Sequence, residues 1–164
     1  MSRNESTELR IDAGAAVPLD ATLCMPEGSR GVVVVAHGSG SRQGNPRSRY
    51  VADALGAHGI GALLVNLLTP GEEAIDAMTA DLRFDVCLLA QRLTATIDEV
   101  RRYPWLKGRH LGLLGASAGA AAALVAASRR PRDVAAVVSA GGRPDLAAQF
   151  LPGDGPDAAH RRRR

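Results

Sequence analysis

The stretch Leu-Leu-Gly-Ala-Ser-Ala-Gly-Ala-Ala-Ala, at residues 113–122, decides the fold. It opens with an apolar run typical of a buried strand and closes with small residues that favour a helix. Between the two stands the pattern Gly-x-Ser-x-Gly, centred on Ser117. A chain that turns sharply from strand to helix tolerates only small neighbours, here Gly115 and Gly119. The pattern therefore predicts that Ser117 sits on a strained turn with its hydroxyl exposed above a sheet.

An exposed serine on such a turn, a nucleophile elbow, is suited to nucleophilic catalysis. The turn aims the backbone N–H of the next residue, Ala118, at the oxyanion of a reacting carbonyl group. Two other interpretations remain. In one, Ser117 only caps the helix that follows. In the other, Gly112, Gly115 and Gly119 bind a dinucleotide, but their spacing is not Gly-x-Gly-x-x-Gly and they follow a late strand.

The rest of the chain alternates strand and helix patterns. Runs rich in aliphatic residues predict three more strands buried on both faces, at residues 31–36, 60–68 and 134–138. Apolar residues at helical spacing predict helices at residues 46–55, 86–100 and 118–127. Alternating apolar and polar residues predict an antiparallel edge hairpin at residues 9–11 and 17–23. This order predicts an α/β fold with three αβα layers around a doubly wound, mostly parallel sheet.

The alternation of strands and helices stops after Val138. Residues 141–144, Gly-Gly-Arg-Pro, predict a turn, and residues 151–164 show no periodicity. We therefore expect one domain over residues 1–151, with its last strand–helix units missing. A disordered basic tail is expected at residues 152–164.

A second glycine-rich segment, Ala-His-Gly-Ser-Gly-Ser at residues 36–41, follows the first buried strand. Its glycines let the backbone approach a substrate closely. The backbone N–H of Ser39 is the predicted second donor to the oxyanion, beside that of Ala118. His37 is interpreted as a residue that fixes the loop by hydrogen bonding. The segment leads to Pro46 without the lysine of a phosphate-binding P-loop.

The composition excludes several classes of protein. Of the 164 residues 46% are hydrophobic, too many for a disordered chain, and the apolar runs are too short to span a bilayer. Only 3% are aromatic, which disfavours a base-stacking nucleic-acid surface. The net charge of +3 depends on Arg161–Arg164, because the other 16 cations are one fewer than the 17 Asp and Glu. We expect a cytoplasmic protein without a secretory signal, a membrane partner or a nucleic-acid partner.

The two cysteines give no sign of a disulfide or a metal site. Cys24 and Cys87 lie far apart in apolar segments, without the spacing of metal ligands. Both are predicted to be reduced, buried side chains.

Five segments, two of them described above, occur together and in one order. They are residues 37–41 with 45–50, 64–69, 81–85 (Asp-Leu-Arg-Phe-Asp), 115–119 and 137–146. In these segments the chain resembles the dienelactone-hydrolase-like branch of the α/β-hydrolases, which includes cytoplasmic bacterial members, some of them fused to phosphoribosyltransferases. The resemblance implies the α/β-hydrolase fold and hydrolysis of an ester or lactone bond in a small acyl compound, with no cofactor and no metal. It implies Ser117 as the nucleophile, where dienelactone hydrolases themselves carry cysteine, and the backbone N–H groups of Ser39 and Ala118 as the oxyanion hole.

The family also requires an aspartate and then a histidine after the serine. Asp145 comes one strand too early and is interpreted as a turn or cap residue after Pro144. His160 lies in the Arg-rich tail, with nothing to hold it. His58 and His110 flank strands and are interpreted as surface residues. The sequence therefore identifies no acid and no base for Ser117.

The tail also permits a second reading frame. Shifted by one nucleotide, GC-rich codons for residues 155–163 permit Ala-Pro-Thr-Leu-Leu-Ile-Val-Gly-Gly, the pattern of a buried strand. We hypothesise a single-nucleotide frameshift, and the alternative is a natural short paralogue; sequencing the DNA around codon 150 distinguishes them. Three functions stay open: an active hydrolase, an inactive remnant that binds an acyl compound, and a module whose basic tail binds nucleic acid or acidic partners.

Overall fold

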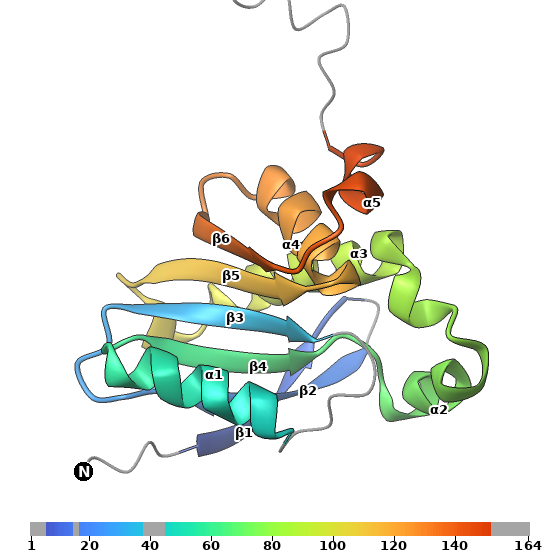
Figure 1. The fold of residues 1–164 in the computed structure, drawn as a ribbon. Coiled ribbons are helices and arrows are strands. Elements are labelled where there is room, and N and C mark those ends of the chain that lie inside the picture. The colour runs from blue at the N-terminus through green and yellow to red at the C-terminus, as the bar shows by residue number, and fades with distance from the viewer. Residues whose placement is uncertain (1–5, 15–16, 38–44, 152–164) are drawn as a thin grey trace, which may run out of the picture.

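The fold is a six-stranded mixed sheet with helices on both faces (Figure 1). The computed structural model describes residues 6–14, 17–37 and 45–151. The strands are β1 (Ser6–Asp12), β2 (Pro18–Cys24), β3 (Gly31–His37), β4 (Gly61–Asn66), β5 (His110–Ala116) and β6 (Val134–Ala140). The helices are α1 (Pro46–Ala57), α2 (Pro70–Thr79), α3 (Val86–Val100), α4 (Ala118–Arg129) and α5 (Pro144–Ala148), with the 3₁₀ turns η1 (Leu82–Phe84) and η2 (Pro104–Leu106).

The sheet has the strand order β1-β2-β4-β3-β5-β6. β1 and β2 form an antiparallel hairpin, β2 also runs antiparallel to β4, and the remaining pairs are parallel. In this register Ala36 lies between Val65 of β4 and Gly115 of β5. The carboxyl ends of these strands therefore meet at one edge, where the chain enters α4 through Ser117. The predicted edge hairpin and mostly parallel α/β sheet are confirmed.

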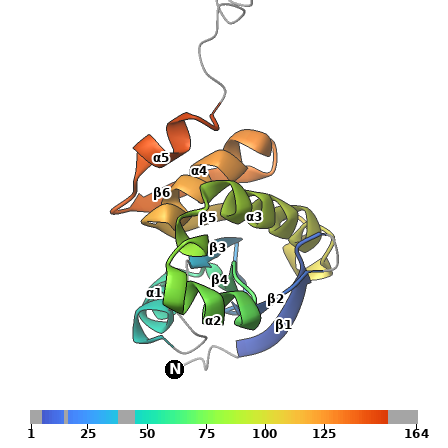
Figure 2. The ribbon, with the colours of Figure 1, turned by 90° about the vertical axis from the view of Figure 1, so that its right-hand side faces the viewer.

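The helices form the outer two layers (Figure 1, Figure 2). Successive residues of a strand point to opposite faces, so Val34 and Val35 of β3 enter different clusters. Val35 packs with Ala52 of α1 on one face, whereas Val34 joins the larger cluster with α3 and α4 on the other. The predicted three-layer arrangement is therefore observed.

Helix α4 lies against the sheet through very small side chains. Ala120, Ala121, Ala122 and Ala123 are all fully buried. Because a methyl group occupies little space, α4 packs closely against the sheet and also against α3. The helix that follows Ser117 is thereby enclosed along most of its length.

The prediction that residues 134–138 are buried on both faces is wrong. β6 pairs with β5, and most of its side chains are exposed, with Val138 53% exposed. The reason is its position, because β6 is the last strand of the sheet that the structure describes. Its apolar sequence matches that of a central strand, but the described residues cover it incompletely. After it the structure adds α5, which the sequence did not predict, beyond the predicted turn at residues 141–144.

The prediction for the cysteines is correct for oxidation state and wrong for burial at one site. Both thiols are free. Cys24 is half-buried at the end of β2, and burial raises its pKa. Cys87 is exposed, because the buried positions at the start of α3 are Val86, Leu89 and Ala90 and residue 87 is not on their side of the helix.

Two kinds of feature are absent from the described ranges. None of their helices is both long and apolar enough to cross a membrane. Within the same ranges no three Asp, Glu, His or Cys side chains gather as metal ligands would.

Candidate active site

Ser117 lies on the turn that the sequence predicts. It follows β5 directly, precedes α4, and has φ of 53° and ψ of −125°. A positive φ is strained for a residue with a Cβ and is often retained where function needs the geometry. The side chain of Ser117 is exposed and makes no capping hydrogen bond to α4. The interpretation of Ser117 as a mere helix cap is therefore not supported.

Close backbone packing explains why glycine stands two residues before the serine. A Cβ on Gly115 would overlap the carbonyl oxygen of Gly119 and lie 2.7 Å from the Cα of Ala120. These atoms belong to the first turn of α4, so the clash is with backbone that a side-chain rotation cannot relieve. Gly115 therefore allows the strand to pass beneath the start of the helix.

The first turn of α4 presents partial positive charge beside Ser117. The carbonyl oxygen of Ser117 accepts hydrogen bonds from the N–H groups of Ala120 and Ala121, at 3.1 and 3.4 Å. The N–H groups earlier in a helix have no intrahelical partner, and the helix dipole adds to their attraction for negative charge. The N–H of Ala118 is thus available where the resemblance places an oxyanion-hole donor.

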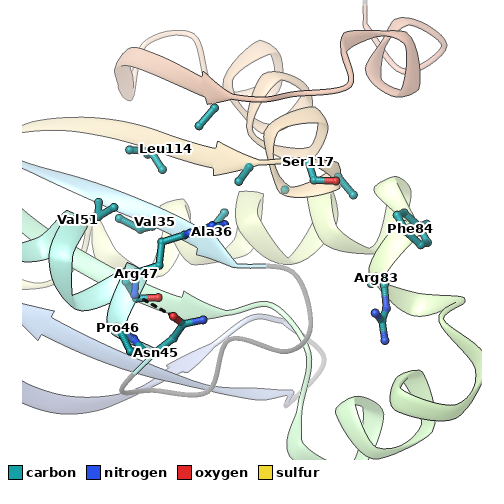
Figure 3. A pocket seen from close by; sticks show the side chains of 15 residues that line it. Val35, Ala36, Asn45, Pro46, Arg47, Val51, Arg83, Phe84, Leu114 and Ser117 are labelled. Atoms are coloured by element: carbon teal, nitrogen blue, oxygen red, sulfur yellow. Dashed lines mark hydrogen bonds between the residues drawn. The ribbon is translucent and has the colours of Figure 1, made fainter.

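A pocket of about 820 Å³ opens at Ser117 (Figure 3). Its floor is formed by the carboxyl ends of β3 and β5, and the first turn of α1 and the η1 turn form its walls. The lining residues in the described ranges are Val35, Ala36, Asn45, Pro46, Arg47, Ser48, Val51, Arg83, Phe84, Leu114, Ala116, Ser117, Ala118, Gly119 and Ala140. This set is mostly apolar with few polar groups, as in sites for small organic molecules. It contains no histidine, aspartate or glutamate.

The other predicted site residues do not join Ser117 within the described part of the chain. Ser39 and His160 lie outside the described residues, and so does the side chain of His37. His58 is exposed at the end of α1, where its Nδ1 lies 2.8 Å from the carbonyl oxygen of Ala54. His110 is exposed at the start of β5, at the opposite end of that strand from Ser117. The interpretation of His58 and His110 as surface residues is confirmed.

Asp145 also has a role away from the serine. It lies in the first turn of α5 and forms an exposed ion pair with Arg143, with 2.7 Å between Arg143 Nη2 and Asp145 Oδ2. Hydrogen bonds from Arg143 hold the pKa of the Asp145 carboxyl below its ordinary value. The sequence-based interpretation as a turn or cap residue agrees with this placement.

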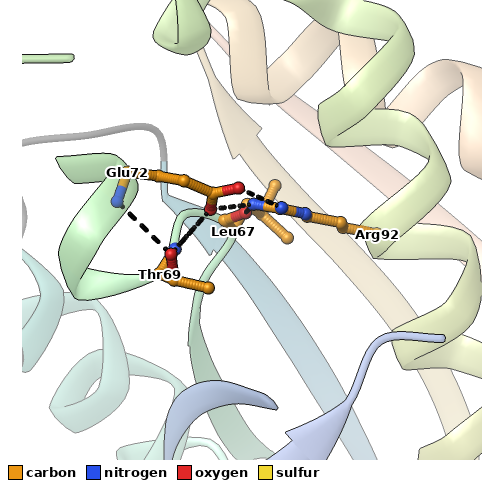
Figure 4. Close-up of polar contacts among 4 residues, drawn as sticks. All are labelled: Leu67, Thr69, Glu72 and Arg92. Carbon is orange, nitrogen blue, oxygen red and sulfur yellow. Dashed lines mark hydrogen bonds and ion pairs between the residues drawn. The ribbon is translucent and has the colours of Figure 1, made fainter. Parts of the chain in front are cut away.

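A polar network anchors α2 beside the site (Figure 4). Arg92 of α3 is nearly buried and donates to the Leu67 carbonyl oxygen at 2.7 Å and to both carboxylate oxygens of Glu72 at 2.5 and 2.6 Å. The same carboxylate accepts the N–H of Thr69, and the Thr69 hydroxyl accepts the N–H of Glu72, which completes a capping box. The start of α2 is thus fixed to the end of β4 and to α3.

Acid is expected to weaken this network. Hydrogen bonding from Arg92 lowers the pKa of Glu72 from 4.5 to about 2. A folded-state pKa below the unfolded value means that the stabilisation is present above the ordinary pKa of 4.5 and is lost as the pH falls toward about 2. Glu72→Gln is expected to cost about 2 kcal/mol at neutral pH and to flatten the loss of stability between pH ~5 and ~2. Urea unfolding across this pH range measures both effects.

A matched control is Glu27→Gln, which removes a carboxylate from an exposed position between β2 and β3. Its stability curve should follow the native one. A Glu72→Gln protein with the full native dependence on acid would show that the Arg92 contact contributes nothing.

Sequence reasoning missed the wall formed by η1. Arg83 and Phe84 appear in the sequence only as part of the Asp-Leu-Arg-Phe-Asp segment of the resemblance, without a role. Helix α2 was also missed, because its exposed apolar residues Ile75 and Met78 do not form a buried stripe. The capping-box pattern of Thr69 and Glu72 is the signal that would have found it.

The chain was compared with known proteins. No family model matches it. In structure it is similar to a dienelactone hydrolase from Anabaena variabilis, at 46% sequence identity and a TM-score of 0.85, over 92% of this chain and 69% of that one. A dienelactone hydrolase-like promiscuous phosphotriesterase from metagenomic libraries shares the fold at 19% identity and a TM-score of 0.62, over 93% of this chain and 70% of that one.

Two curated relatives carry a different name. Both are proteins of Mycobacterium tuberculosis named, provisionally, phosphoribosyl transferases, and each is 46% identical over 144 residues. The match covers 88% of this chain and 31% of each relative, so the chain spans about a third of their length. Their name therefore describes proteins of which this chain matches a minor part.

The similarity to the Anabaena protein extends over two thirds of that molecule and nearly all of this one. The chain belongs to the dienelactone-hydrolase-like family of α/β-hydrolases.

Proposed function

We propose that the protein hydrolyses an ester or lactone bond of a small acyl compound through a covalent intermediate on Ser117. The observation that carries the proposal is the strained, uncapped Ser117 at the mouth of a mostly apolar pocket and at the start of α4. Backbone strain of this kind is retained at functional sites where a side chain must be held in one direction.

The proposed chemistry has two steps. The Ser117 oxygen attacks the acyl carbon, its proton passes to a base, and the negative charge on the carbonyl oxygen lies near the N–H of Ala118 and the start of α4. The bond to the alcohol oxygen then breaks, and the alcohol leaves with that proton. Water adds to the acyl-serine in the same way and releases the carboxylic acid and Ser117. Serine supplies the nucleophile, so the proposed mechanism uses no metal and no cofactor.

Ser39 is proposed as the second oxyanion-hole donor, on the strength of the family resemblance. The proposed working environment is the cytoplasm, with a small molecule as the partner.

A second candidate function rests on a specific observation. None of the described residues that line the pocket is a histidine, aspartate or glutamate, and a serine without a base is a weak nucleophile. On this account the chain is an inactive relative that retains a pocket for an acyl compound. A role in binding nucleic acid through Arg161–Arg164 would depend on residues outside the described ranges.

Covalent labelling tests the proposal. We expect a fluorophosphonate ester to form one adduct per chain, and peptide mass spectrometry to place it on Ser117. Phosphonates react with activated serines, so labelling reports activation without requiring knowledge of the substrate. Ser128, whose hydroxyl donates to the Val125 carbonyl oxygen at 2.7 Å, is an internal control and should remain unlabelled. A native protein that stays unlabelled, with an intact fold by circular dichroism, would favour the inactive relative.

A further inference from the structure

The η1 turn forms the wall of the pocket beside Ser117 through two adjacent residues. Arg83 and Phe84 both line the pocket. Phe84 is 56% exposed and lines the pocket, so its side chain is accessible to a molecule bound there. Figure 3 shows Phe84 at the level of Ser117, while the guanidinium group of Arg83 points away from the serine.

Arg83 is directed toward α2, where Asp76 binds it in three places. The Arg83 backbone N–H donates to Asp76 Oδ1 at 2.8 Å, and Arg83 Nε donates to Oδ2 at 2.8 Å. Arg83 Nη2 donates to the Asp76 carbonyl oxygen at 2.9 Å. The Asp76 side chain is fully buried, whereas that of Arg83 is 37% exposed. Three hydrogen bonds from one residue to another fix both the backbone and the side chain of Arg83.

Asp76 is in turn anchored to the protein core through its helix. It lies one helical turn after Glu72, whose carboxylate is bound by Arg92 of α3. Contacts therefore run from α3 through α2 to η1. A wall made of a three-residue 3₁₀ turn has little stability of its own, so its position depends on these contacts.

We propose that Asp76 is a positioning residue that acts through Arg83 to hold Phe84 against the pocket, and that Phe84 thereby selects flat, aromatic acyl groups. Aromatic rings gain energy from offset or edge-to-face contact with other flat rings, beyond the area they bury. The guanidinium group of Arg83 serves to hold the turn, since Asp76 occupies its donors Nε and Nη2. The proposal about selectivity rests on the proposed function, whereas the positioning of η1 by Asp76 does not.

The test compares p-nitrophenyl benzoate with p-nitrophenyl acetate, which share a leaving group and differ in the acyl group. Asp76→Asn and Phe84→Leu are each expected to lower the ratio of kcat/KM for benzoate over acetate by roughly 10-fold. The effect should arise mainly from a higher KM for the benzoate. The control is Asp98→Asn, because Asp98 accepts hydrogen bonds from Nε and Nη2 of Arg130, both at 2.6 Å, away from the pocket. Its ratio should stay native.

A ratio that Asp76→Asn leaves unchanged would overturn the proposal, since a purely structural role would lower both activities alike. Because Asp76 is buried, its variant can fail to fold; in that case Phe84→Leu decides, and an unchanged ratio there has the same consequence. A third ester, the p-nitrophenyl monoester of succinic acid, tests Arg83 directly. If Arg83→Met lowers turnover of this anionic ester alone, Arg83 binds the substrate and the proposed role is wrong.

Hydrogen exchange separates this inference from the proposed function. In Asp76→Asn the amides of residues 82–85 should exchange faster than in the native protein, while Asp98→Asn leaves them unchanged. If the native protein neither hydrolyses these esters nor reacts at Ser117, the proposed function fails. The exchange measurement still decides on positioning, because native exchange rates at residues 82–85 in Asp76→Asn would overturn it.

Discussion

Alanine at position 117 is expected to remove ester hydrolysis while leaving the protein folded. Ser117 makes no capping hydrogen bond and its side chain is exposed, so loss of the hydroxyl removes no contact that holds α4. In a serine protease with its full set of catalytic groups, loss of the serine lowers kcat on the order of 10⁶-fold. We expect a loss approaching that size in kcat/KM for p-nitrophenyl acetate, with an unchanged melting temperature.

Two further variants sharpen this result. Ser139→Ala removes a hydroxyl from the end of the neighbouring strand, outside the pocket lining, and should leave turnover native. Ser117→Gly should be inactive and more stable than Ser117→Ala by about 1 kcal/mol, because glycine adopts a φ of 53° without strain. Equal turnover by the native and Ser117→Ala proteins would rule out serine catalysis. Serine and histidine act as a unit, so it would also indicate that no base is engaged.

Alanine at position 115 is expected to disrupt the turn and with it the fold around α4. The new Cβ would overlap the Gly119 carbonyl oxygen and lie 2.5 Å from the Gly119 carbonyl carbon. Relief requires α4 to move away from β5, yet α4 also packs against α3. We expect a loss of about 3 kcal/mol or more in unfolding free energy. Any protein that remains folded should react far more slowly with a fluorophosphonate, because Ser117 would be displaced.

Gly112 provides the matched control on the same strand. A Cβ there would lie 3.4 Å from Val33 Cγ2 and 3.6 Å from the Ala136 carbonyl oxygen, which is ordinary contact. Gly112→Ala should therefore unfold within about 1 kcal/mol of the native protein in urea. If Gly115→Ala were as stable as Gly112→Ala, the close approach of β5 and α4 would have to be abandoned.

Local patterns predicted most of the fold. Each of the four parallel strands, β3 to β6, lies within two residues of a run that the sequence marks as apolar, and Pro46 and the alanines after Ser117 mark helices correctly. These features depend on neighbours along the chain. The burial of β6 could not be predicted in the same way, because exposure of an apolar strand depends on what lies beside it in space.

In the candidate site, too, the features that are local in sequence could be predicted and the contacts between distant residues could not. Ser117 and its neighbours could be predicted because Gly-x-Ser-x-Gly, the strand before it and the helix after it are contiguous in sequence. The hydrogen bonds between Asp76 and Arg83 join helix α2 to the η1 turn. Neither element was predicted, and no local sequence pattern encodes their contact. The positions of Phe84 and of the buried Asp76 follow from the contacts of η1 with α2 and α3, which only the folded chain reveals.

The alanine-rich start of α4, directly after Ser117, limits which substitutions the protein tolerates. Fully buried methyl groups at residues 120–123 leave no room for a longer side chain. In a saturation library selected for folded protein, residues 118–123 should therefore stand out as a block that accepts little besides alanine, glycine and serine. The first turn of α1 lines the same pocket, but its exposed Arg47 should accept most residue types. Directed evolution of this pocket has to proceed through α1 and η1, while α4 stays fixed.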